Sequence, residues 1–374
     1  MEKRIKLAEL ELLRGIAILA VLAIHTTSYA AAKLPMDSTF YPVYHIINTA
    51  ANFAVPAFMF LSALLLFYHY DSAGGRSWLT FYRKRIKTIV VPYLLWSVFY
   101  SAVVMLISHA GFKASVSRFF HGLAVGGSYA HLYFIIVIAQ FYAIFPLLHA
   151  LLRIRFVRDH PLLCGAAAQT AFYLLNYYYI HMHKIGTFIG SYLLYLFLGA
   201  YAAGKWKERE NNRASSHGWL LFTGFLLAAA LYVVQTWLQK TDPHWIPQPF
   251  LSNLNFVSDY TYSAVSCLAL LHFSKRIEQS RFSLLKRMLF SIGIYSFGIY
   301  FIHPFILLLW RLKVMNGAPV VYHLLTFAGG AVALGLSWLT TWLVQRTRLG
   351  SFVVGRSDVK APSVQTQPNA TTSA

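Results

Sequence analysis

Three ionisable side chains lie inside stretches of the sequence that are otherwise apolar. Arg14 and His25 belong to ELLRGIAILAVLAIH, and His303 belongs to YSFGIYFIHP. An ionisable group in hydrocarbon is unfavourable, so such a residue usually has a partner or a function. A neutral imidazole near pH 7 accepts a proton from a hydroxyl group, and a guanidinium grips phosphate by paired hydrogen bonds. These residues are therefore the first candidates for chemistry.

Their spacing on a helix brings the candidates together. Eleven residues make about three turns, so Arg14 and His25 lie nearly on one face, roughly 16 Å apart along the axis. His303 lies about 20 Å along its own span, close to the depth of His25. With Tyr300 and Ser296 one and two turns away, it predicts a polar cavity between two helices.

Each candidate also has a structural explanation that the sequence leaves open. Arg14 is explained equally by a boundary position, paired with Glu11 or reaching toward water. His25 is explained by a hydrogen bond to a neighbouring helix. His303 is explained by the helix break at Pro304, which leaves the carbonyl group four residues back without its usual partner.

Two further groups stand at span ends. His131 opens HLYFIIVIAQ with Tyr133, a pair that either anchors the helix at the outer interface or binds a substrate. Arg83, Arg85 and Lys87 precede a span in TFYRKRIKTIVVPY. The basic cluster is explained either by membrane topology or by a phosphate-binding entrance.

The elements that must position these residues are membrane helices. The 374 residues are 57% hydrophobic and 12% charged, with a mean hydropathy of +0.53, whereas soluble domains carry about 25% charged residues. Apolar runs of helical membrane-spanning length recur along the chain. They predict an all-α, polytopic transmembrane bundle of about ten helices at 8–32, 44–68, 87–110, 131–152, 161–180, 186–204, 218–238, 256–274, 289–310 and 322–344.

The distribution of positive charge predicts the orientation. Most of the 32 lysines and arginines fall in loops on the side that holds both termini, so we expect both termini to be cytoplasmic. The formal charge of +20 is spread over short loops, which argues against nucleic-acid binding. We expect one transmembrane domain, 1–350, followed by a disordered cytoplasmic tail, 351–374, which is polar and rich in Pro, Ser and Thr.

Several chemistries lack their sequence motifs. The chain has no Walker loop, no GxSxG and no HExxH, which disfavours a soluble-type ATPase, a hydrolase or a zinc enzyme. Cys164 and Cys267 fall in apolar spans outside any metal-ligand spacing. We therefore predict no metal site.

Five landmarks in order resemble the acyltransferase family 3 membrane proteins over essentially residues 8–344. They are the arginine, ten residues, histidine pattern of Arg14 and His25; VPAFMFLSALLLF around Ser62; RKRIKTIVVPY; HLYF from His131; and YSFGIYFIHP with His303. Three positions depart from the usual pattern: Ala63 replaces a glycine, Tyr133 a tryptophan, and Lys87 stands near a common second arginine.

The resemblance implies an O-acyltransferase of a bacterial cell membrane. It implies transfer of an acyl group, usually acetyl, from cytoplasmic acyl-CoA to a hydroxyl of a surface or exported saccharide. On this reading the site comprises catalytic His25, Arg14 and His303, donor-binding Arg83, Arg85, Lys87 and Arg14, and substrate-binding His131, Tyr133, Tyr300 and Ser62. The partners are acyl-CoA as co-substrate, the saccharide and the lipid bilayer, with no permanently bound cofactor.

A competing class shares most of these features. A polysaccharide or lipid-linked saccharide exporter also needs buried polar residues and aromatic side chains, and members of the intercellular-adhesin subgroup have been read as exporters. An exporter needs no phosphate-binding entrance, and it usually shows an internal repeat, which the sequence lacks. A purely structural membrane protein explains neither deep histidine. The sequence therefore favours the acyltransferase.

Overall fold

The computed structural model describes residues 8–72, 77–109, 111–209, 218–242, 244, 246–314 and 319–355. Every regular element in these ranges is helical, which confirms the all-α prediction. The elements are α1 Ala8–Lys33, α2 Tyr41–Ala50, α3 Ala54–Ser72, α4 Trp78–Arg85, η1 Ile86–Val90, α5 Val91–Ser108, α6 Phe112–Val125, α7 Tyr133–Leu151, α8 Arg155–Asp159, α9 Pro161–Leu175, η2 Asn176–Ile180, η3 Ile185–Thr187, η4 Ile189–Tyr192, α10 Leu193–Arg209, α11 Gly218–Thr241, α12 Gln248–Gln279, α13 Ser283–Lys313, α14 Pro319–Gln345 and α15 Gly350–Val353.

Seven helical segments within the described ranges are long and apolar enough to cross a membrane. They are Ala8–Lys33, Tyr41–Tyr70, Trp78–Ser108, Tyr133–Leu151, Gly218–Thr241, Ser283–Lys313 and Val320–Gln345. The three remaining predicted spans coincide with α9 and η2, with η3 to α10, and with α12. Each of the ten predicted spans thus coincides mainly with helix, while the cytoplasmic placement of both termini stays a prediction.

One predicted span is interrupted. The run 44–68 divides into α2 and α3 around residues 51–53, where the backbone turns. Pro56 stands in the first turn of α3 and has no N–H to donate to the carbonyl group of Asn52. The break therefore follows from a residue that an apolar-run search ignores.

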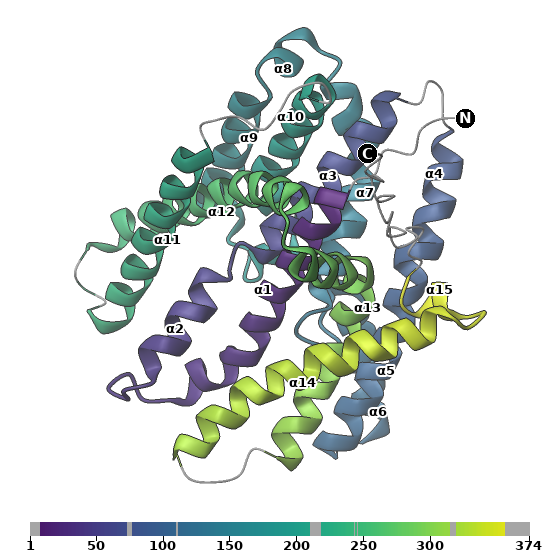
Figure 1. The fold of residues 1–374 in the computed structure, drawn as a ribbon, viewed down its shortest axis with the longest axis vertical. Helices are drawn as coiled ribbons and strands as arrows, with labels where there is room; N and C mark the ends of the chain where they lie inside the picture. Colours follow the sequence, from purple (N-terminus) through teal and green to yellow (C-terminus); the bar gives the residue numbers. More distant parts are fainter. Residues whose placement is uncertain are drawn as a thin grey trace, which may run out of the picture.

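Helices α1 and α13 form the centre of the bundle (Figure 1), where they make the most extensive helix–helix contact. Two glycines permit their close approach. A Cβ on Gly15 would lie 2.3 Å from the backbone oxygen of Leu289, and one on Gly293 would lie 1.9 Å from that of Glu11. Because the two helices touch here through backbone, the turns that carry His25 and His303 are fixed relative to each other.

Other helices surround this pair. In Figure 1, α9, α10 and α11 gather on the side opposite α5 and α6. Helices α11 and α12 share a polar seam, in which Gln235 Nε2 donates to Asn255 Oδ1 at 2.6 Å. Interhelical amide bonds of this kind hold membrane helices together.

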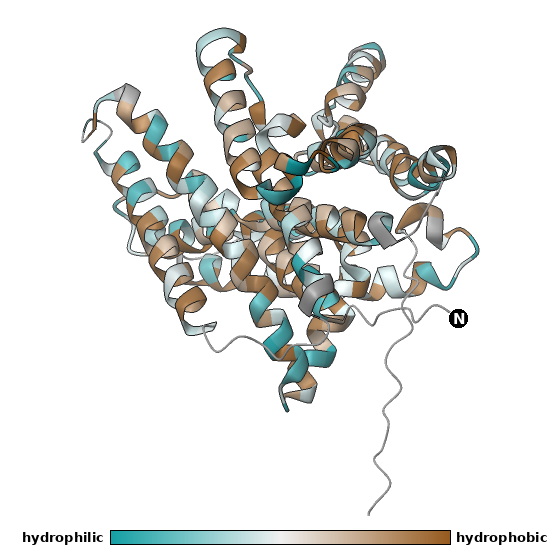
Figure 2. Cartoon of the chain, turned by 90° about the horizontal axis from the view of Figure 1, so that it is seen from above, coloured by the Kyte–Doolittle hydropathy of each residue, from teal (hydrophilic) through white to brown (hydrophobic). Residues whose placement is uncertain are grey.

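The outward faces are apolar. Leu106 in α5 and Leu231 in α11 leave 73% and 70% of their surface exposed, and Figure 2 shows hydrophobic residues along most of the helices. Exposed apolar side chains in such number are expected when the surrounding medium is lipid. The chain is therefore a multi-pass membrane protein.

The long segment Trp78–Ser108 contains a wider turn. The N–H of Val91 donates to the carbonyl group of Ile86, five residues back, so η1 is a π-helical turn. Pro92 follows directly and cannot donate to the carbonyl group of Thr88. The proline accounts for the departure from α-helical bonding at this position.

The start of the predicted disordered tail is ordered. Residues 350–353 form α15, and the Trp96 indole N–H donates to the carbonyl oxygen of Val353 at 2.8 Å. Val354 is buried. Residues 350–355 therefore contact the bundle. The division into a domain at 1–350 and a disordered tail stays a prediction, and 356–374 lies outside the described residues.

Candidate functional site

Three imidazoles from three distant parts of the chain meet in one place. The ring centroids of His25 and His303 are 5.2 Å apart, those of His131 and His303 are 6.1 Å apart, and those of His25 and His131 are 6.4 Å apart. His131 and His303 are buried, with 2% and 0% exposed. We call these residues the histidine cluster. The structure thus brings the two deep histidines together, and it adds His131, which the sequence placed at the outer interface.

Helix geometry fixes the tautomer of His303. Its Nδ1 lies 2.8 Å from the carbonyl oxygen of Ile299, one turn earlier in α13. A carbonyl oxygen only accepts, so Nδ1 carries the hydrogen and Nε2 presents a lone pair. Nε2 is buried and has no hydrogen-bond partner among the described residues. Nε2 of His303 is therefore an oriented hydrogen-bond acceptor within the histidine cluster.

The turn before α7 places His131. Gly126 adopts a left-handed conformation with φ of +70°, and a Cβ there would lie 2.4 Å from the Cα of Tyr133. The Tyr300 hydroxyl donates to the backbone carbonyl of His131 and ties this turn to α13. Both ring nitrogens of His131 are buried and without a partner among the described residues. The loop is thus shaped to present a second unpaired imidazole.

Tyrosines form one wall of the cluster. Tyr100 and Tyr129 stack on each other with ring centroids 4.5 Å apart, and each lies edge-on to His131 at 5.0 and 5.7 Å. The Tyr100 hydroxyl donates to the carbonyl oxygen of Phe301 at 2.6 Å. Burial raises the pKa of the Tyr129 phenol, against the opposing effect of Arg311, so this hydroxyl stays neutral.

An arginine braces His25 from the other side. The guanidinium of Arg311, eight residues beyond His303 in α13, donates to the backbone carbonyl of His25. Sequence reasoning missed Arg311 and Tyr100 as site residues. The sequence contains one signal for Arg311: it is a positive charge at the outer end of its span, where the positive-inside rule predicts few cations. The sequence contains no such signal for Tyr100, because a tyrosine within an apolar span does not stand out as a polar residue.

The surroundings of the three imidazoles favour their neutral form. None of the three imidazoles has a hydrogen-bonded carboxylate in the part of the chain that the structure describes. A buried imidazolium without such a partner is unfavourable, and a second positive charge 5–6 Å away more so. The arrangement therefore keeps the imidazoles neutral at rest, the form in which a histidine takes a proton from a hydroxyl.

The basic cluster is divided between solvent and protein. Arg83 and Lys87 are exposed, whereas Arg85 is half-buried, with its guanidinium over the rings of Tyr142 and Phe81 at 4.6 and 5.3 Å. Arg85 Nε is buried with no partner among the described residues. We call Arg83, Arg85 and Lys87 the basic entrance. Arg85 is held by aromatic rings with donors still to satisfy, as an anion site requires.

The other predicted residues lie around these two regions. Arg14 pairs with Glu11, with Nη1 2.8 Å from both carboxylate oxygens. Tyr300 packs edge-on against His131 at 5.1 Å, and Tyr133, at the start of α7, neighbours Tyr300 and Tyr192. Ser62 is half-buried in α3. The functional roles of all four stay predictions.

Comparison with known proteins settles the family. The model of the family described as an acyltransferase domain matches residues 7–342. The chain belongs to the acyltransferase 3 family. The match spans all three imidazoles and the basic entrance, so both regions lie within the part of the chain that the family shares.

The curated relatives within this family carry two kinds of name. The chain is 28% identical over 318 residues to the "Probable poly-beta-1,6-N-acetyl-D-glucosamine export protein" of Staphylococcus aureus (strain MRSA252), covering 82% of this chain and 83% of that protein. It is 23% identical over 373 residues to the "Putative membrane-bound acyltransferase YfiQ" of Bacillus subtilis (strain 168), covering 94% and 95%. A Staphylococcus epidermidis export protein of the first name is 26% identical over 347 residues, covering 89% of each chain. No solved structure matches the chain.

Proposed function

We propose that this protein is an O-acyltransferase that moves an acyl group, acetyl in the simplest case, from cytoplasmic acyl-CoA to a hydroxyl of a cell-surface or exported saccharide. One observation carries the proposal: the His25 imidazole lies with His303 and His131 in one cluster, with ring centroids 5.2 and 6.4 Å away, and two of these rings keep buried nitrogens without partners among the described residues. A proton acceptor that is oriented and sheltered from water suits activation of an alcohol.

The donor would bind from the end of the bundle that carries the basic entrance. Arg85, with Arg83 and Lys87 beside it, would hold the phosphates of the nucleotide portion. Arg14, three turns from His25 on α1, would contact a phosphate or the pantetheine arm near the mouth. The arm would then carry the thioester toward the histidine cluster.

Transfer would proceed with an imidazole as general base. The acceptor hydroxyl oxygen attacks the thioester carbon while His25 takes the hydroxyl proton. The carbon–sulfur bond breaks, and the proton passes to the departing thiolate to give free CoA. His303 or Tyr300 would position the acceptor, and a neutral hydroxyl in the site would donate to the developing oxyanion. A route through a transiently acylated His25 uses the same residues.

The decisive experiment is thiol release from acetyl-CoA by purified protein in detergent. We expect slow release by the wild type, even to water, and its loss in His25→Ala with an unchanged melting temperature. His183→Ala is the matched control, because that imidazole is exposed. Equal release from His25→Ala and wild type would contradict the mechanism.

The names of the relatives favour a second function, export of a poly-N-acetylglucosamine. An exporter of that kind needs the polar interior without a donor site. Liposomes that take up a labelled N-acetylglucosamine oligosaccharide, with no binding of acetyl-CoA or another acyl-CoA to the protein, would favour export over transfer. Transfer of a labelled acyl group to the oligosaccharide, together with release of free CoA, would favour the acyltransferase.

A further inference from the structure

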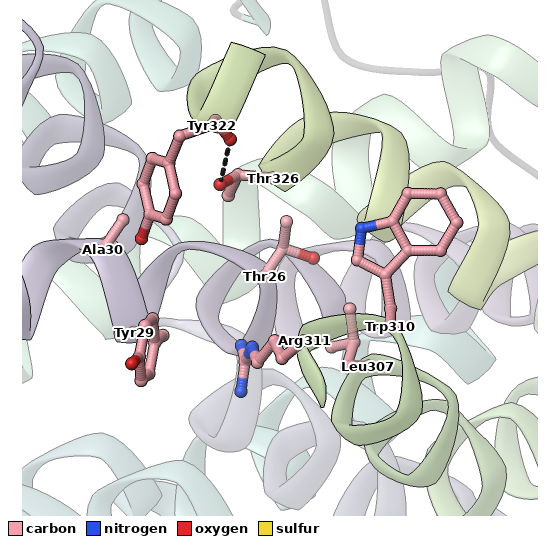
Figure 3. Close-up of a pocket in the computed structure, with 8 residues that line it drawn as sticks. All are labelled: Thr26, Tyr29, Ala30, Leu307, Trp310, Arg311, Tyr322 and Thr326. Atoms are coloured by element: carbon pink, nitrogen blue, oxygen red, sulfur yellow. Dashed lines mark hydrogen bonds between the residues drawn. The ribbon is translucent and has the colours of Figure 1, made fainter. Parts of the chain in front are cut away.

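A hollow opens between α1, α13 and α14, on the side of His25 that faces away from Arg14. Figure 3 shows the eight residues that line it: Thr26, Tyr29, Ala30, Leu307, Trp310, Arg311, Tyr322 and Thr326. The hollow is shallow: its space is about 240 Å³ only when the open mouth is counted, and its enclosed part has room for about one water molecule. Arg311, which lines the hollow, donates to the backbone carbonyl of His25, so the hollow lies beside the turn of α1 that carries His25.

The hollow has hydrogen-bond donors that the protein leaves unused. The Thr26 hydroxyl is buried without a partner among the described residues. Arg311 uses one N–H on the carbonyl oxygen of His25, and a guanidinium has five. Figure 3 shows its guanidinium extended toward Tyr29, whose ring centroid is 5.5 Å away. The guanidinium of Arg311 is therefore placed to donate to oxygen atoms of a ligand at the mouth of the hollow.

Flat aromatic surfaces complete the lining. Tyr29 is 46% exposed, Tyr322 is half-buried, and Trp310 is fixed by its indole N–H, which donates to the carbonyl oxygen of Leu325 at 2.9 Å. A phosphate ion would make no favourable contact with the three aromatic rings, and an acyl chain would make none with the guanidinium. A sugar ring presents an apolar face and several oxygens, which matches both features.

We propose that the mouth of this hollow is a binding subsite for the glycan acceptor, where a sugar unit linked to the one being acylated lies against the exposed rings. The proposal rests on the proposed function and names its acceptor site. Arg311 lies eight residues from His303, about 12 Å along α13. Tyr29, Tyr322 and Arg311 would therefore bind a neighbouring unit of an oligosaccharide while the reacting hydroxyl reaches the histidine cluster.

The hydrogen bond from Arg311 to the backbone of His25 links this subsite to the histidine cluster. A sugar oxygen could accept a hydrogen bond from the same Arg311 guanidinium. Such a bond would shift the Arg311 side chain, which also holds the backbone carbonyl of His25. Occupation of the hollow is thus linked to the placement of the base. A single sugar, too short to span both places, would be a poorer acceptor than an oligosaccharide of the same units.

Binding of a β-1,6-linked N-acetylglucosamine oligosaccharide to the purified protein tests this inference without any turnover. We expect Tyr29→Ala and Tyr322→Ala each to weaken binding about tenfold in calorimetry, in line with a lost aromatic contact of roughly 1 kcal/mol or more. Arg311→Lys should weaken it too, because the charge remains and the forked donors do not. Tyr178→Ala, an exposed tyrosine in η2, is the matched control and should bind as the wild type.

Several results would overturn the inference. Wild-type affinity in both tyrosine variants, absence of oligosaccharide binding, or displacement of the oligosaccharide by millimolar inorganic phosphate would each exclude a glycan subsite here. Thiol release answers the separate question of the reaction. His25-dependent release with no effect of the hollow variants on glycan binding leaves the acyltransferase and removes the subsite. Glycan binding in the hollow with no acyl-CoA turnover leaves the subsite and removes the reaction.

Discussion

The histidine cluster and the basic entrance are both rich in nitrogen, yet they are built in opposite ways. His131 and His303 are buried and keep ring nitrogens without partners among the described residues, and His25 is half-buried. In the basic entrance, Arg83 and Lys87 are exposed to solvent, and Arg85 rests on two aromatic rings. Unpaired buried groups are expensive to maintain and intolerant of change, whereas exposed charges contribute separately and are screened by salt. The contrast fits the proposal that the histidine cluster carries the chemistry and the basic entrance binds the donor.

The largest effect should come from the histidine cluster. We expect His303→Ala to lower kcat for acyl transfer by about 10²-fold, because an acceptor hydroxyl that is misplaced relative to His25 reacts more slowly by that order. The double variant with His25→Ala should be little worse than either single variant, since residues that act together lose their effect together. Multiplicative losses measured in steady-state kinetics would assign the two histidines to separate steps.

The scaffold shared by both regions should be nearly as sensitive. Gly293→Ala places a methyl group against the backbone of Glu11 and should destabilise the protein by about 1–3 kcal/mol. We also expect it to reduce both turnover and donor affinity, because α1 carries His25 and Arg14. Gly335→Ala, where a Cβ meets nothing within 4 Å, is the control for thermal unfolding and should be neutral or stabilising. Equal melting temperatures for the two variants would contradict the tight contact.

The basic entrance should respond in affinity alone. Arg85→Ala should raise KM for acyl-CoA by about tenfold or more, since a hydrogen bond to a charged group contributes roughly 1.5–3 kcal/mol. Its kcat at saturating donor should stay near that of the wild type. Arg153→Ala, an exposed arginine in the turn after α7, serves as the control. If donor binding is unchanged in Arg85→Ala, the basic entrance reflects membrane topology only.

The smallest effect should separate two roles of Arg14. If Arg14 contacts the donor, Arg14→Gln should raise KM for acyl-CoA a few-fold while Glu11→Gln leaves KM unchanged or lowers it. If the pair is structural, both variants should lose the same small stability, about 1 kcal/mol or less for a partly exposed ion pair. Donor titrations and melting curves of the two variants and of the double variant distinguish these cases.

Much of the fold follows from the sequence because apolar run length and helical rise are local properties. Counting along two spans was enough to place His25 and His303 at one depth. Pro56 is a signal in the sequence for the break between α2 and α3, but a search for apolar runs does not take the proline into account. Arg311 and Tyr100 could not be assigned, since the bonds to His25 and Phe301 depend on how helices pack. His131 was predicted as a site residue, but its depth depends on the turn at Gly126.

The π-helical turn at η1 has a consequence for comparisons among relatives. A π turn holds one more residue than an α turn, so the segments on either side of Ile86–Val90 are out of phase by one position. Removing one residue there would restore α-helical bonding and rotate Arg83 and Arg85 by about 100° relative to α5. Relatives that align without a gap through this segment should share the orientation of the basic entrance. Relatives with a one-residue deletion should keep its arginines but direct them away from Tyr142.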